Sequence, residues 1–130
     1  MSEPRWLTRL MIDTIHAELI AEHGGAHSLR EGGDQLVGSA LDRPRNRLAY
    51  VPDADIASLT AALLFGLVKN HGYVDGNKRV GFASAATFLL LNGRLLTASE
   101  VEAYDAVIAI TQDRLTEDGL TGWLRQHTTG

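Results

Sequence analysis

The most polar short segment of the chain runs from His71 to Arg79 and reads His-Gly-Tyr-Val-Asp-Gly-Asn-Lys-Arg. It carries an imidazole, a carboxylate, a carboxamide, an ammonium and a guanidinium, which are the groups that perform acid–base and phosphate chemistry. Strongly apolar stretches flank it on both sides, at 56–70 and 80–91. A connection between two buried helices needs no such side chains, so this segment is the candidate functional site.

The second half of the segment predicts an anion-binding site. Gly76 permits a positive φ, and the free N–H groups of Gly76, Asn77 and Lys78 begin a helix, where the positive end of the helix dipole attracts an anion. Lys78 and Arg79 add two cationic donors to the same first turn, where positive charge is unfavourable for the helix itself. A bound polyanion would offset that cost, so these residues favour phosphate binding.

The first half of the segment adds groups that suit phosphoryl transfer. Asp75 supplies a hard oxygen ligand that could hold Mg²⁺ against phosphate oxygens. Histidine titrates near neutral pH, so His71 could take a proton from an attacking hydroxyl. Taken alone, a histidine at a helix end is more often a capping or core residue. The register of His71 with the polar residues that follow it favours the catalytic interpretation.

The elements that must position this segment are predicted to be helices. The spacing of apolar residues indicates an all-α, compact bundle with at most one short β-hairpin or flap. Ser2 is expected to cap a first helix, with Pro4 in its first turn, that ends at Gly24-Gly25. Asp34 is expected to cap a short second helix that Pro44 breaks within 43–47, the least regular and most basic stretch.

The remaining helices are predicted from caps and apolar runs. Asp53 or Asp55 would cap a helix over 56–70, which is apolar around nearly its whole circumference and therefore buried on most sides. A second buried helix is expected from Gly76 to Asn92, with Gly93 as a left-handed C-cap. Residues 94–97 favour a brief extended piece. A capping box at 99–102 is expected to begin a fifth helix that reaches about Arg114, and Thr116 is expected to cap the last helix.

The composition excludes several classes of protein. A chain of 130 residues with 45% apolar residues predicts one globular domain over 1–130. Its net charge of −4 gives no general attraction for nucleic acid or a membrane surface, and no apolar run is long enough to span one. Without cysteine, thiolate catalysis and disulfides are excluded. The start of the chain does not resemble a secretory signal, so we expect a cytoplasmic protein.

The segment is not a Walker loop, because the Gly-x-x-x-x-Gly-Lys pattern is missing and no strand precedes it. It resembles the core motif of the Fic/Doc family, which in the Doc branch reads His-x-Phe-x-Asp-x-Asn-Lys-Arg. Here Tyr73 stands for the Phe, and the other motif positions match. The resemblance extends to the Gly-Gly end of the first helix, to the Ser-Ala-Leu-Asp-Arg-Pro stretch at 39–44 and to the end of the motif helix at 88–93.

The resemblance implies an activity and a set of residue roles. His71 would be the general base, Asp75 the carboxylate that binds Mg²⁺, and the positions that bind the phosphates of ATP would be Gly76, Asn77, Lys78 and Arg79. Tyr73 would seat the turn in the core. The lysine at position 78 goes, in the family, with transfer of the γ-phosphate instead of AMP. The implied function is that of a toxin that phosphorylates a Ser or Thr hydroxyl of a translation factor, elongation factor Tu, and arrests translation.

Two departures refine this expectation. The Fic branch has a second Arg three residues after the first, and Phe82 stands there in this chain. This argues against AMP transfer. The family's inhibitory motif, which is Ser or Thr, three further residues, Glu, and Gly or Asn, is missing from the first helix and from the stretch that follows it. Inhibition would then come from a cognate, Phd-like antitoxin whose tail folds onto the toxin.

Other interpretations stay open at this point. The same fold could transfer AMP to a protein hydroxyl, or the segment could belong to a non-catalytic binding module. The arginines of 43–47 are more simply a solvated face, although the family's flap for the target lies there. The histidines outside the segment are predicted to be solvent or capping residues, and a zinc site built from His23 and His27 lacks further ligands. Four aromatic residues are expected in the core or at its rim, namely Trp6, Tyr50, Tyr104 and Trp123.

Overall fold

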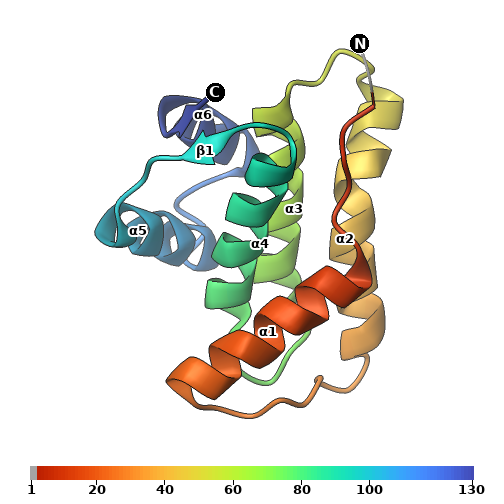
Figure 1. The fold of residues 1–130 in the computed structure, drawn as a ribbon, viewed down its shortest axis with the longest axis vertical. Helices are drawn as coiled ribbons and strands as arrows, with labels where there is room; N and C mark the ends of the chain where they lie inside the picture. The colour runs from red at the N-terminus through yellow and green to blue at the C-terminus, as the bar shows by residue number, and fades with distance from the viewer. Residues whose placement is uncertain (1–2) are drawn as a thin grey trace.

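The computed structural model describes residues 3–130 as a helical bundle with one very small sheet (Figure 1). Its elements, in chain order, are α1 (Arg9–His23), α2 (Gly33–Tyr50), α3 (Ile56–Asn70), α4 (Asn77–Leu91), β1 (Leu95–Leu96), α5 (Glu100–Thr111), α6 (Glu117–Gln126) and β2 (Thr128–Thr129). The prediction of an all-α class is confirmed. The small sheet is not a hairpin, because its two paired strands are distant in sequence, with Leu95 opposite Thr129 in an antiparallel pair.

The two most apolar helices, α3 and α4, lie side by side at the centre (Figure 1). One cluster of buried side chains fills the side toward α1 and α2, and it includes Ile12, Val37, Leu63 and Phe88. A second cluster fills the side toward α5 and α6. Because helices pack against α3 and α4 from both sides, the two hold the polar turn between them in a fixed place.

Helix α1 begins later than the sequence predicts. Its first residue is Arg9, and Thr8 caps it by accepting a hydrogen bond from the Met11 N–H at 3.2 Å. The predicted cap, Ser2, lies outside the described residues. Before the helix, Trp6 stacks on Phe88 with ring centroids 6.1 Å apart, so the N-terminal segment is held by packing on the core.

Helix α2 is the clearest correction to the sequence analysis, because it continues through Pro44 to Tyr50. Proline inside a helix costs about 3 kcal/mol, so tertiary contacts must offset that loss. Pro44 is buried, and Arg43 and Arg47 both form ion pairs with Glu117 of α6. These two arginines are therefore not a solvated face, since they link α2 to the C-terminal helix.

The predicted cap Asp34 is wrong, because Gly32 precedes α2 as its N-cap and Asp34 lies within the first turn. The predicted caps of the later helices are confirmed. Asp55 caps α3, accepting from the Ser58 N–H at 3.0 Å, and Ser99 and Glu102 form the reciprocal capping box of α5. Thr116 caps α6. Gly93, just beyond α4, has a left-handed φ of 75° as expected. Helix α5 ends at Thr111 instead of near Arg114, because Asp113 adopts a positive φ of 58°.

Within residues 3–130, none of the helices combines the length and the apolar character that crossing a bilayer requires.

Candidate active site

The polar turn is bounded by two residues in the left-handed region. His71 ends α3 with φ 54°, and Gly76 precedes α4 with φ 85°. A left-handed conformation is unfavourable for a residue with a Cβ atom, so His71 is held there by its surroundings. The chain reverses between these two points, which places the turn at one end of the central helix pair (Figure 1).

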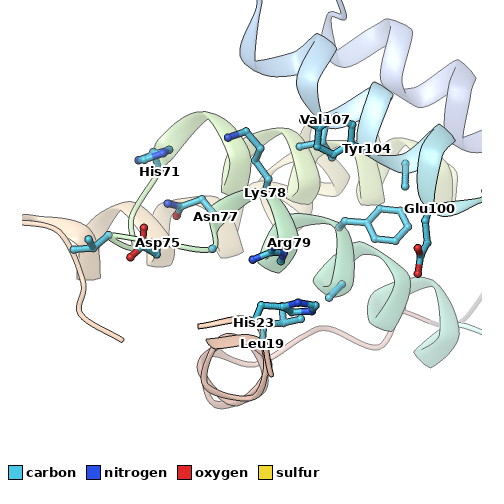
Figure 2. Close-up of a pocket in the computed structure, with 15 residues that line it drawn as sticks. Leu19, His23, His71, Asp75, Asn77, Lys78, Arg79, Glu100, Tyr104 and Val107 are labelled. Atoms are coloured by element: carbon cyan, nitrogen blue, oxygen red, sulfur yellow. The ribbon is translucent and has the colours of Figure 1, made fainter. Parts of the chain in front are cut away.

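An open cavity of about 710 Å³ lies beside this turn (Figure 2). The end of α1, the start of α4 and one face of α5 form its walls. All six residues that the sequence predicts for the site line it, namely His71, Asp75, Gly76, Asn77, Lys78 and Arg79. The cavity has the size of a small-molecule or cofactor site.

The first turn of α4 is open toward a ligand. Gly76 caps the helix without a side chain, and the N–H groups of Asn77, Lys78 and Arg79 have no protein acceptor within residues 3–130. The side chains of Lys78 and Arg79 are exposed and form no ion pair with another described residue. Unpaired donors and two cations at the positive end of a helix form a site for phosphate.

The side chain of Asn77 has a structural role that the sequence analysis did not foresee. It is buried, its Nδ2 donates to the Tyr73 carbonyl at 2.7 Å, and its Oδ1 accepts from the Tyr73 N–H at 3.0 Å. One donor of Nδ2 and one lone pair of Oδ1 are thus used within the turn. The backbone N–H of Asn77 has no acceptor among the described residues, so it is available for the predicted anion.

Tyr73 connects the turn to α1. Its hydroxyl donates to Asp13 Oδ1 at 2.7 Å, and burial together with Asp13 raises the pKa of the phenol. Its ring stacks on His16 at 3.8 Å. The expectation that Tyr73 seats the turn agrees with these contacts.

His16 is not the solvent or capping residue that the sequence predicts. It is only 3% exposed, and its Nε2 lies 2.9 Å from the Asp75 carbonyl oxygen, to which it must donate because a carbonyl only accepts. Of the other histidines, His23 is exposed at the cavity wall, and His127 stacks on Trp123 and bonds to Glu102. Sequence periodicity placed His16 on α1 but could not show what faces it.

Residues 26–30, which we call the strap, run antiparallel to the first half of the turn. The Ala26 N–H donates to Asp75 Oδ2 at 2.8 Å, the Val74 N–H donates to the Ser28 carbonyl at 2.9 Å, and the Arg30 N–H donates to the Gly72 carbonyl at 2.9 Å. An isolated bridge between Leu29 and Tyr73 lies among them. Sequence reasoning missed this segment, because its pairing partners are far away in the chain.

Sequence reasoning also missed Arg30, which contacts His71. Its Nη1 donates to the His71 carbonyl at 2.8 Å and lies 3.3 Å from His71 Nδ1. The guanidinium therefore supports both the left-handed backbone of His71 and the orientation of its ring.

The wall opposite the turn is formed by α5 and by the middle of α4. Phe82, Ala103 and Val107 make it largely apolar, and Glu100 lies at its far end (Figure 2). Tyr104 is 64% exposed there, which places it at the rim of the cavity and outside the core. An apolar wall beside a cationic helix start suits a ligand with a flat ring at one end and phosphates at the other.

A divalent cation would find one free carboxylate oxygen in this site. Oδ2 of Asp75 is held by the Ala26 N–H, and Oδ1 has no hydrogen-bond donor among the described residues. Within residues 3–130 no group of three His, Cys, Asp or Glu could hold a metal ion. The residues present fit Mg²⁺, because this ion binds through one or two carboxylates together with substrate phosphates and water.

The chain belongs to the Fic/DOC family, whose sequence model matches residues 6–89. It is 42% identical over 88 residues, or 66% of its length, to a protein of Mycolicibacterium smegmatis named toxin Doc. It is 29% identical over 79 residues to protein kinase doc of Escherichia phage P1. These alignments span 65% and 61% of the two relatives, which is less than two thirds of each.

Proposed function

We propose that this chain is the toxin of a toxin–antitoxin pair, a Doc-type kinase that transfers the γ-phosphate of ATP to a Ser or Thr hydroxyl of a translation factor, with elongation factor Tu as the target. The observation that carries the proposal is that His71, Asp75 and the unpaired first turn of α4 line one cavity. The names of the two relatives support a toxin and a kinase.

The residues have distinct roles in this reaction. The target hydroxyl gives its proton to His71 as its oxygen attacks the γ-phosphorus, and the bond from that phosphorus to the bridging oxygen breaks as ADP leaves. The N–H groups of Asn77, Lys78 and Arg79, with the two cationic side chains, hold the phosphate oxygens as charge develops. Asp75 would hold Mg²⁺, which, when bound, offsets negative charge on those oxygens.

The direction of ATP binding separates this proposal from AMP transfer. Lys78 stands where the AMP-transferring branch of the family has Gly, and Phe82 stands where that branch has a second Arg. Phe82 lines the cavity, so the wall lacks the cation that this arginine would supply for a further phosphate group. These two positions favour transfer of the terminal phosphate.

The test uses ATP labelled at either the α- or the γ-phosphate, with purified elongation factor Tu as substrate. We expect label on the factor from γ-labelled ATP alone, with Mg²⁺ required. The matched control is the His71→Ala variant, which should leave elongation factor Tu unlabelled. Label transferred only from the α-phosphate would establish AMP transfer instead.

The partner and the biological effect need a separate experiment. We expect the wild-type chain to arrest growth when expressed and the His71→Ala variant to be harmless, and we expect co-expression of the neighbouring antitoxin gene product to restore growth. If the His71→Ala variant arrests growth as the wild type does, the chain acts as a binding module without turnover.

A further inference from the structure

We propose that the turn formed by Gly24, Gly25 and Ala26 at the end of α1 positions the Asp75 carboxylate for the metal ion, by holding Oδ2 so that Oδ1 alone faces the ion. The inference rests on the proposed function, in which Asp75 binds Mg²⁺ together with ATP. It assigns a role in metal binding to residues that lie outside the motif and about fifty positions before Asp75 in the chain.

Groups from α1 and from the residues after this helix hold both the side chain and the main chain of Asp75. The Ala26 N–H donates to its Oδ2 at 2.8 Å, and the His16 side chain donates to its main-chain oxygen at 2.9 Å. The carboxylate itself is exposed, and an exposed aspartate would otherwise sample several rotamers. Fixing one oxygen leaves the other for a single bond to the cation, so phosphate oxygens and water fill the remaining positions around it.

Gly25 is the residue on which this arrangement depends. Its φ is 115°, and a Cβ built on it would lie 3.1 Å from Asp75 Cβ and 3.3 Å from Asp75 Oδ2. A side chain at this position would therefore press on the Asp75 side chain, which would have to shift. The φ of 115° favours glycine here as well.

Gly24 provides a matched control next to it. Its φ is 83°, so an alanine there suffers a similar kind of backbone strain, but its Cβ would meet no atom within 4 Å. Gly24→Ala and Gly25→Ala thus both place an alanine at a positive φ in the same turn, so both carry a cost in backbone strain. They differ in contact with Asp75, and Gly25→Ala also brings its Cβ within 3.2 Å of Ile20 Cδ1.

The experiment measures binding of Mn²⁺, as a substitute for Mg²⁺, to each variant in complex with a non-hydrolysable ATP analogue, by electron paramagnetic resonance. We expect Gly25→Ala to weaken Mn²⁺ binding about 10-fold, the lower end of the range for lost support of a metal ligand, and Gly24→Ala to stay within about 2-fold of wild type. At saturating metal ion, the KM for ATP should be equal in both. Equal Mn²⁺ affinities in the two variants would overturn the proposal.

A second measurement uses neither glycine variant, so it does not depend on whether those variants fold. In an amide NMR spectrum, Asp75→Asn should shift the Ala26 resonance, and Mn²⁺ should broaden the Ala26 resonance in the nucleotide complex more than that of Thr116. An Ala26 resonance insensitive to both would contradict the proposal. Failure of the proposed function has a different signature, because the wild-type chain would then transfer no γ-phosphate even where the Mn²⁺ affinities of the two glycine variants differ.

Discussion

The two halves of the polar turn differ in how their hydrogen-bonding groups are used. In the first half, from His71 to Asp75, backbone and side-chain groups are bonded to the strap, to α1 and to Asn77. In the second half, from Gly76 to Arg79, the backbone donors and the two cations have no protein partner within residues 3–130. The first half is thus held in one shape by the protein, and the second half keeps its donors free, as the proposed phosphate binding needs.

This difference separates the residues whose loss should affect stability from those whose loss should affect activity. Unsatisfied donors at a helix start cost the free protein little, because water reaches them. Removing a partner from a buried hydrogen bond leaves a polar group without water, which is costly. Substitutions that remove a bond holding the first half and substitutions that remove a free cation of the second half should therefore have opposite signatures.

The largest effect is expected in the open half. Arg79→Ala should lower the kcat of phosphate transfer about 10²–10³-fold, roughly 2.7–4 kcal/mol, because it removes a donor from the transferring phosphate. Its free energy of unfolding should stay the same or rise slightly, since a cation leaves the positive end of α4. Phosphate-transfer kinetics together with urea unfolding test this. A large loss of stability would show that Arg79 has a structural role.

Asn77→Ala should have the opposite signature. It leaves the N–H and the carbonyl of Tyr73 without partners in a buried position, so the free energy of unfolding should fall by about 2–3 kcal/mol. Urea denaturation measures this change. Lys78→Ala, one residue away, is the control and should be nearly neutral for stability. A neutral Asn77→Ala variant would show that this side chain, which lies in the second half, does not hold the backbone of the first half in place.

A smaller effect is expected at the contact between the turn and α1. Tyr73→Phe removes the hydroxyl that donates to Asp13 but keeps the ring stacked on His16. Because Asp13 is partly exposed and retains Arg9, we expect a loss of about 1 kcal/mol in stability. Thermal unfolding of the variant beside Asp13→Asn measures it, and the double variant should lose little more than either single one.

The smallest effect lies far from the turn and depends on pH. The Trp123 carbonyl and then Glu102 raise the pKa of His127, while the Ser99 backbone and then His127 lower the pKa of Glu102. The contribution of His127 to the free energy of unfolding is complete below about pH 6.5 and is lost as the pH rises through the raised pKa. The contribution of Glu102 is present above pH 4.5 and is lost as the pH falls through the lowered pKa.

The two pKa shifts together define where this pair matters most. His127→Gln should reduce stability most between about pH 4.5 and 6.5, and the difference from wild type should shrink on either side. Unfolding curves recorded across this range test the expectation. The Glu102 side chain is 51% exposed and solvent reaches the pair from that side, so added salt should weaken the effect. A difference that stays constant with pH would show that the pair contributes nothing through its charges.

What could be predicted from the sequence was local. In the caps at Asp55, Ser99 and Thr116, the side chain accepts a hydrogen bond from the backbone N–H three residues later. Spacing in the sequence is therefore enough to predict them. The polar turn was recognisable because its residue types contrast with the two apolar stretches that flank it. In both cases the interacting groups are neighbours in the chain.

What the sequence could not show are the contacts between distant residues. His16 and Ala26 reach Asp75 across separations of 59 and 49 residues, and Arg43 reaches Glu117 across 74. Helical periodicity places a residue on a face but does not say which group meets it there. The early end predicted for α2 failed for the same reason, because the packing that keeps Pro44 inside a helix comes from other elements.

The sequence by itself thus determined the helical class, the position of the turn and the chemical groups within it. Only the tertiary structure decided which of those groups are occupied by the protein and which are free for a ligand. The physical reason is that a hydrogen-bonding group becomes a binding group only when no other part of the chain satisfies it, and that depends on how the helices pack. Asn77 and Lys78 are adjacent and both polar, yet the fold uses one side chain to build the turn and leaves the other at the cavity.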